Sequence, residues 1–220
     1  MLKSIKGWLW SSGPTWHYRR IWLDALVATA VINLVAFLAA WAIGLSVHEI
    51  FLEDGPIEDL QSLSLAVAAV VAGIAALRLS ILARYVAITT ACIAAIFFMR
   101  EMPICRADTS FFCVSKMMLP IAIAVIASLL LIATALFELR HRGGMLRAIH
   151  PRLSWPLAFT AIVLGASQVA EKLDIVFAEE LLESYGFMVL VMSAIWLFRF
   201  SRRQGAAPVG SGRKAVSARY

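Results

Sequence analysis

The chain has 220 residues, of which 61% are hydrophobic and 15% are charged, and its mean hydropathy is +0.83. Soluble domains are roughly half apolar and a quarter charged, so this composition excludes an ordinary water-soluble domain. The net charge of +6 arises from 20 basic and 14 acidic residues, which lie mainly between long apolar blocks. Blocks of about 20 apolar residues are long enough to cross the hydrocarbon core of a bilayer as helices.

Six apolar blocks predict an all-α membrane bundle of six transmembrane helices. No polar stretch between the blocks is long enough to fold as a separate domain, so we expect one membrane domain over residues 22–203. A basic, aromatic interfacial segment precedes it at 1–21, and a disordered basic cytoplasmic tail follows at 204–220. In chain order the predicted spans are 22–44, 60–80, 83–99, 117–137, 156–172 and 184–200.

The distribution of charge predicts that both termini lie in the cytoplasm. Under the six-span topology, 16 of the 20 basic residues fall on the side of the termini, and 12 of the 14 acidic residues fall on the other side. Lys and Arg collect in the cytoplasmic loops of membrane proteins. We therefore expect a multi-pass protein of a bacterial-type inner (cytoplasmic) membrane, with its basic side against the anionic headgroups of the lipid bilayer.

The same basic residues do not predict a nucleic-acid partner. They are divided among four short segments next to the membrane, and no recognisable nucleic-acid-binding motif accompanies them. Attraction to lipid headgroups is sufficient to explain them.

Two of the three cysteines share one predicted outer loop. Cys105 and Cys113 lie within residues 100–116, whereas Cys92 lies inside the third span. If the outer space is oxidising, one interpretation is a disulfide that closes this loop, and the other is two free thiols. A metal site is disfavoured because the spacing is not CxxC and two cysteines leave a tetrahedral ion incompletely coordinated.

Acidic residues from all three predicted outer loops form the one group in the sequence that could carry chemistry. Glu179 and Glu183 are four residues apart and share one face of the sixth span, and Glu58 and Gln61 are three apart on the second span. Ionisable groups at membrane depth are unfavourable unless they have a role, so converging acids predict a functional site. The candidate ligand-binding residues are Glu58, Gln61, Glu101, Gln168, Glu171, Glu179 and Glu183.

The chemistry of these residues predicts a cation ligand. Carboxylates without imidazole favour protons, amines and hard cations, so the expected cofactor is a divalent cation such as Ca²⁺, Mg²⁺ or Mn²⁺, held by Glu58, Glu101 and Glu183. The alternative is structural. Pro56 followed by Glu58 and Asp59 is typical of a helix start, where acids stabilise the positive end of the helix dipole.

Three functions remain open from the sequence. The first is cation binding or transport at the outer face, and the second is a membrane-embedded, metal-dependent enzyme that acts on a lipid. The third is a non-catalytic partner or assembly subunit whose outer loops dock a basic protein. A homo-oligomer is open under any of the three. The chain has no GxSxG, HExxH, P-loop or dinucleotide-binding motif, so the common hydrolase and nucleotide-binding signatures do not support an enzyme.

Overall fold

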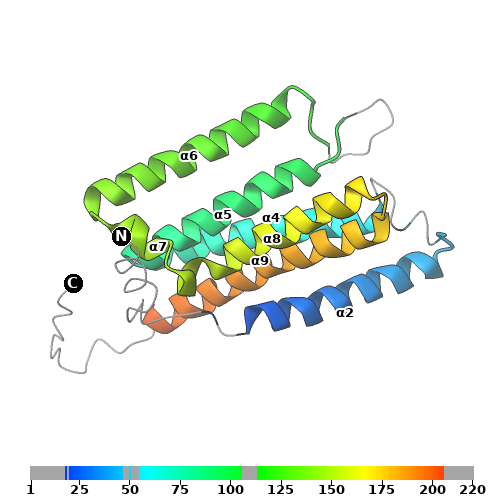
Figure 1. Cartoon of the computed structure of the whole chain (residues 1–220), viewed down its shortest axis with the longest axis horizontal. Helices are drawn as coiled ribbons and strands as arrows, with labels where there is room; N and C mark the ends of the chain where they lie inside the picture. Colours follow the sequence, from blue (N-terminus) through cyan, green and yellow to red (C-terminus); the bar gives the residue numbers. More distant parts are fainter. Residues whose placement is uncertain (1–17, 19, 47–49, 51–54, 106–112, 206–220) are drawn as a thin grey trace.

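The computed structural model describes residues 18, 20–46, 50, 55–105 and 113–205. In that part of the chain, six helices are long and apolar enough to cross a membrane, and no strand is formed. The predicted all-α bundle of six membrane-spanning helices is therefore confirmed, and Figure 1 shows the long helices lying side by side. The helices are α2 (Ile21–Ala42), α4 (Pro56–Arg78), α5 (Ile81–Glu101), α6 (Met118–Arg140), α7 (Gly144–Ala148), α8 (Pro151–Lys172) and α9 (Val176–Gly205).

The last two spans begin earlier than the apolar blocks predict. α8 starts at Pro151 instead of residue 156, and α9 starts at Val176 instead of residue 184. Hydropathy detects the part of a helix that lies in hydrocarbon, whereas the helix itself continues as long as its backbone hydrogen bonds are made. As a result, Glu183 lies about 11 Å along α9 and is not a loop residue.

α9 is the central helix of the bundle. It packs against α4, α8, α2 and α5, and its apolar stretch is the most buried of the six. The contact with α8 is close at Gly186, because a Cβ added there would lie 3.1 Å from Leu164 Cδ2. α4 also presents small residues to the core, with Ala68, Ala72 and Ala75 fully buried. Small residues allow helix backbones to approach each other in membranes, where burial of apolar surface gives little driving force.

α6 lies at the edge of the bundle, beside α5 (Figure 1). All of its residues are described and none of them is buried. Near one end, Tyr85 of α5 stacks on Phe137 with ring centroids 4.4 Å apart, and its hydroxyl lies 2.9 Å from Thr134 Oγ1. This contact attaches α6 to α5, and the remaining apolar surface of α6 suits the lipid phase.

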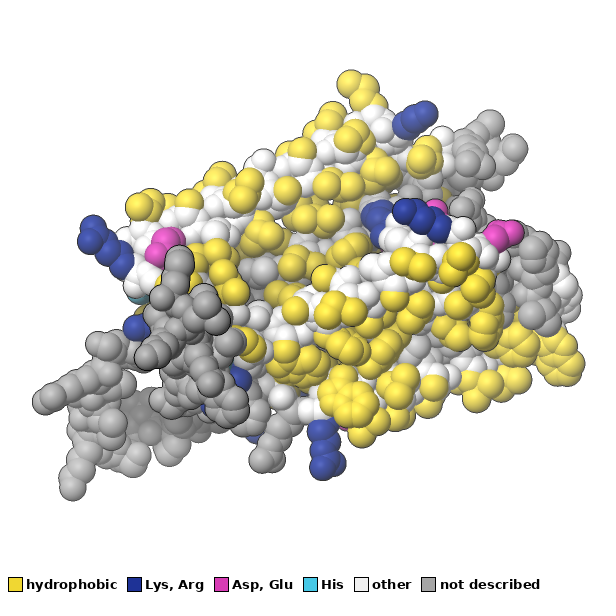
Figure 2. Space-filling model, in the orientation of Figure 1, with side chains coloured by type: hydrophobic (Ala, Val, Ile, Leu, Met, Phe, Trp, Pro, Cys, Tyr) yellow, Lys and Arg dark blue, Asp and Glu magenta, His cyan; other side chains and the backbone are white. Residues whose placement is uncertain are grey.

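The two ends of the bundle are formed by different turns and helix ends. The turn between α4 and α5, the short helix α7 and the end of α9 lie at one end in Figure 1, and the end of α5 and the turn between α8 and α9 lie at the other. Hydrophobic side chains cover the flank between these ends (Figure 2). Which end faces the cytoplasm stays a prediction from the distribution of charge.

The segment before α2 is described only at Tyr18 and Arg20. Tyr18 is buried, with its ring 4.7 Å from that of Trp196 and 6.5 Å from that of Trp155. This last aromatic residue of the predicted interfacial segment therefore packs against α8 and α9. The rest of that segment lies outside the described residues, as does the predicted tail after residue 205.

The connection between α5 and α6 is closed by a disulfide. Cys105 and Cys113 are bonded, with their Cα atoms 4.9 Å apart, while Cys92 is a free thiol. The backbone also pairs across the base of the loop, where the amide of Cys105 donates to Val114 O at 3.0 Å. The sequence left open whether these two cysteines form a disulfide or remain free thiols, and in the structure they form the disulfide. Residues 106–112, between the cysteines, lie outside the described part of the chain.

Removing this disulfide should lower the free energy of unfolding by about 2 kcal/mol, because a loop closed over eight residues restricts the unfolded chain. The comparison is a denaturant titration in detergent of the parent and the variant with Cys105→Ser and Cys113→Ser, with and without reductant. Cys92→Ser is the control and should behave as the parent. Equal unfolding midpoints for the parent with and without reductant would contradict the prediction.

Candidate functional site

One arginine joins two acids at the end of the bundle where α5 ends. Arg100 Nη2 donates to Glu183 Oε1 at 2.9 Å, and Arg100 Nε lies 3.3 Å from Glu101 Oε1. The side chain of Arg100 is 43% exposed, whereas those of Glu101 and Glu183 are 7% and 6% exposed. The guanidinium therefore reaches from the surface to two buried carboxylates on different helices.

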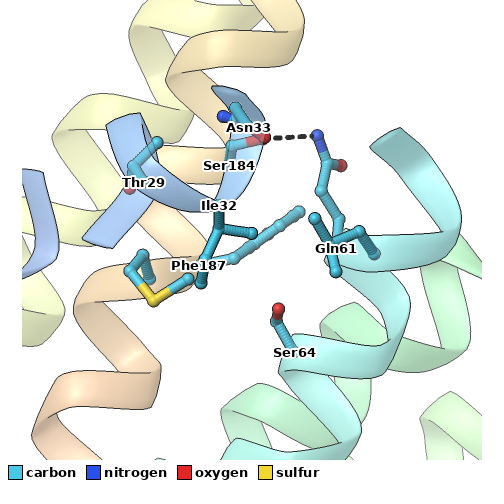
Figure 3. Close-up of a pocket in the computed structure, with 9 residues that line it drawn as sticks. Thr29, Ile32, Asn33, Gln61, Ser64, Ser184 and Phe187 are labelled. Carbon is cyan, nitrogen blue, oxygen red and sulfur yellow. Dashed lines mark hydrogen bonds between the residues drawn. The ribbon is translucent and has the colours of Figure 1, made fainter. Parts of the chain in front are cut away.

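Gln61 of α4 forms the second half of the same site. Its Nε2 donates to Glu180 Oε2 at 2.9 Å and lies 3.0 Å from Ser184 Oγ, so it links α4 to α9. Figure 3 shows Gln61 extending toward Ser184, with Asn33 of α2 beside them. Within the described residues, the buried Oε1 of Gln61 has no hydrogen-bond partner. A buried amide oxygen without a partner is unfavourable and marks a position where a ligand or water could bind.

Two serines position the acids from neighbouring helices. Ser167 Oγ of α8 lies 2.8 Å from Leu164 O and 3.2 Å from Glu183 Oε1, so one hydroxyl proton is shared between two acceptors. Ser62 Oγ of α4 donates to the backbone oxygen of Glu101 at 3.1 Å. Four helices thus contribute to one group, which we call the carboxylate cluster. Its members are Gln61, Ser62, Arg100, Glu101, Ser167, Glu180, Glu183 and Ser184.

When all of its acids are ionised, the carboxylate cluster carries more negative than positive charge. Its acids are Glu101, Glu180 and Glu183, and its one base is Arg100. Glu58 lies within electrostatic range of both Glu101 and Glu180 and adds to the imbalance. Because burial removes hydration from carboxylates, an excess of this kind favours the approach of a positive charge.

The predicted candidates divide into those that the structure brings together and those that it does not. Gln61, Glu101 and Glu183 belong to the carboxylate cluster. Glu58 is half-buried in the first turn of α4, which starts at Pro56 and has Gly55, without a side-chain cap, at the N-cap position. Among the described side chains, no three of His, Cys, Asp and Glu are grouped so that they could hold a metal ion. Whether Glu58, Glu101 and Glu183 bind a metal ion stays a prediction.

The remaining candidates lie outside the carboxylate cluster. Gln168 and Glu171 are exposed on α8, although Glu171 is within electrostatic range of Arg100. Glu179 is half-buried on α9 and interacts electrostatically with the neighbouring Glu180. Whether any of these residues binds a ligand stays a prediction.

Five members of the carboxylate cluster were not among the predicted candidates, namely Ser62, Arg100, Ser167, Glu180 and Ser184, and three of these, Ser167, Glu180 and Ser184, lie on α8 and α9. The spacing of buried residues would have located them. On α9, Glu180, Glu183 and Ser184 precede the fully buried Phe187 at the intervals of one helix face. On α8, Ser167 follows Thr160 and Leu164 on the buried stripe, and the polar residue next to it, Gln168, faces away.

A small cavity lies beside the carboxylate cluster, between α2, α4 and α9 (Figure 3). Its volume is about 10 Å³, and Asn33, Gln61, Ser64 and Ser184 are among the residues that line it. Space of this size admits roughly one water molecule, which needs two to four polar partners. Asn33 Nδ2 is buried without a hydrogen-bond partner in the described part of the chain, so the lining can supply such partners.

The fold and this site define a multi-pass membrane protein that holds a buried cluster of carboxylates and one arginine at one end of a six-helix bundle. No protein-family model, curated protein or solved structure shows significant similarity to the chain. Its function must therefore be argued from the site itself.

Proposed function

We propose that the protein binds a small cation at the carboxylate cluster. The observation that carries the proposal is that the carboxylate cluster holds three acids and one base, Arg100, which contacts the buried Glu101 and Glu183, while Glu180 is hydrogen-bonded to Gln61. One arginine balances one carboxylate, so ionisation of all three acids leaves negative charge in a region of low dielectric without an equal counter-charge. Uptake of a cation removes this imbalance, and ionisable groups at membrane depth have a functional role by default.

The geometry favours a proton or a monovalent ion over a divalent one. Ca²⁺ and Mg²⁺ require six or more oxygen ligands, and no three acidic, histidine or cysteine side chains of the described chain are grouped to supply them. The adjacent cavity, at about 10 Å³, has space for roughly one water to complete a coordination shell. A proton requires no shell. The divalent cation predicted from the sequence is therefore the less favoured form of the proposal.

The proposal concerns binding and does not extend to passage across the bundle. Deeper in the helices, the hydroxyls of Thr29, Thr90 and Ser193 each donate to a carbonyl of their own helix. The hydrogen bonds of these hydroxyls are made within their own helices, and the hydroxyls provide no charged binding position for an ion along the bundle. If the predicted orientation holds, the carboxylate cluster binds its cation from the outer side of the membrane.

Cation binding should raise the melting temperature of the detergent-purified protein, since a ligand that binds only the folded state stabilises it by mass action. The measurement compares Na⁺, K⁺, Mg²⁺, Ca²⁺ and Mn²⁺ at constant ionic strength, an EDTA-treated sample and a series of pH values. We expect one ion or acidic pH to stabilise the parent. At 100 times its dissociation constant, a ligand contributes about 2.7 kcal/mol. Glu101→Gln and Glu180→Gln should each lose most of this effect.

The matched control is Glu179→Gln, which removes the same charge one residue away from the Gln61 contact. This variant should keep the response of the parent. Loss of the response in Glu179→Gln to the same extent as in Glu180→Gln would indicate general screening of surface charge. A parent that responds neither to ions nor to pH would remove the basis of the proposal.

A further inference from the structure

A second site lies away from the carboxylate cluster, on the flank formed by α4 and α5. It is an open groove of about 410 Å³ whose lining is mostly apolar. Its floor is made by the small residues Gly73, Ala76 and Ala91, and Ile88 lines it from α5. A Cβ added at Gly73 would meet no atom within 4 Å, so the floor is open there. The groove faces the flank of the bundle, where the surrounding medium is hydrocarbon.

One end of the groove carries a single fixed charge, Arg84. Its Nε donates to Ala76 O at 3.1 Å and to Leu79 O at 2.9 Å, carbonyls at the end of α4. The one Nε hydrogen is shared between these two carbonyls, which holds the planar guanidinium in place, and no contact of Nη1 or Nη2 is found among the described residues. In the described part of the chain, Arg84 forms no ion pair with a carboxylate. A fixed guanidinium with open terminal nitrogens matches the bidentate geometry of a phosphate.

We propose that this groove binds one anionic phospholipid, with its phosphate on Arg84 and one acyl chain along the floor at Gly73 and Ala91. An apolar groove that opens sideways suits a hydrocarbon chain, and the isolated charge at its end suits a phosphate. The turn between α4 and α5 lies at the end of the bundle where the basic residues collect, which favours an anionic headgroup over a zwitterionic one. The inference is independent of the carboxylate cluster.

Native mass spectrometry of the full-length protein in detergent tests this site, with phosphatidylglycerol and phosphatidylcholine as probes. We expect one phosphatidylglycerol to be retained in preference to phosphatidylcholine, and inorganic phosphate not to displace it. Arg84→Gln should weaken retention by about tenfold, since it removes a charge-assisted bidentate contact. Gly73→Leu should weaken it as well, because the new side chain fills the floor while the bonds from Arg84 to α4 remain.

Two control variants separate the groove from its surroundings. Arg142→Gln removes an exposed charge at the same end of the bundle, and Gly165→Leu adds a side chain on α8 where a Cβ also meets no atom within 4 Å. Both should retain the lipid as the parent does. Equal weakening by Arg84→Gln and Arg142→Gln, or displacement by inorganic phosphate, would overturn the proposal. So would full retention by Gly73→Leu.

Discussion

Replacing Arg100 with glutamine should lower the free energy of unfolding by about 2 kcal/mol, because two buried carboxylates then lose their counter-charge. Breaking a fully buried ion pair costs roughly 3 to 5 kcal/mol, and the smaller figure reflects the 43% exposure of the Arg100 side chain. The measurement is an unfolding titration in detergent of the parent and Arg100→Gln.

The experiment also includes Glu183→Gln and the double substitution of Arg100→Gln and Glu183→Gln, which complete a double-mutant cycle. The double substitution removes both the arginine and the carboxylate that it contacts, so it should recover part of the lost stability and give a coupling energy of about 1 to 2 kcal/mol. Lys172→Gln, which removes an exposed charge at the end of α8, is the control and should change stability by less than about 0.5 kcal/mol. If the two substitutions are additive, the contact between Arg100 and Glu183 has no energetic role in the protein.

Replacing Gly186 with leucine should destabilise the bundle by about 2 to 3 kcal/mol, because the added atoms overpack the contact between α8 and α9. A Cβ alone would lie 3.1 Å from Leu164 Cδ2 and 3.2 Å from Leu164 Cγ. The change should also move Ser167 away from Glu183, since the two residues lie on the helices that are forced apart. We therefore expect the cation response in the melting assay to decrease with stability.

Gly165→Leu is the matched control for this substitution. Gly165 is exposed on α8, and a Cβ there would meet no atom within 4 Å. Leucine has a better helix propensity than glycine by up to about 1 kcal/mol, so this variant should be as stable as the parent or slightly more stable. If Gly186→Leu has the same melting temperature as Gly165→Leu, α8 and α9 are not in close contact at this position.

The number of membrane-spanning helices followed from properties that are local in the sequence. The hydropathy of each apolar block, such as residues 117–137, depends only on the residues in that block, so a span can be predicted without knowing which helices surround it. The helix ends were less well determined. α9 extends eight residues before the predicted span, since acidic residues such as Glu179 lower the hydropathy of a turn without interrupting its hydrogen bonds.

The members of the carboxylate cluster depended on rotation of the helices, which hydropathy does not report in a chain that is apolar on nearly all faces. The interval from Glu179 to Glu183 predicted that both acids share one face of α9, but Glu180 is the residue that Gln61 contacts. The difference between adjacent positions is about 100° around the helix axis, and it decides whether a carboxylate meets another helix. Only the packing of α9 against α4 fixes that angle.

The sequence by itself determined the class of protein, the number of spans and the concentration of acids at one end, because composition and charge act residue by residue. The tertiary structure decided that Arg100 is shared between Glu101 and Glu183, that Gln61 joins α4 to α9, and that Gln168 faces away. These contacts join residues up to 123 positions apart. They exist only because small residues allow the helices to pack closely, a property of pairs of helices that no single segment reveals.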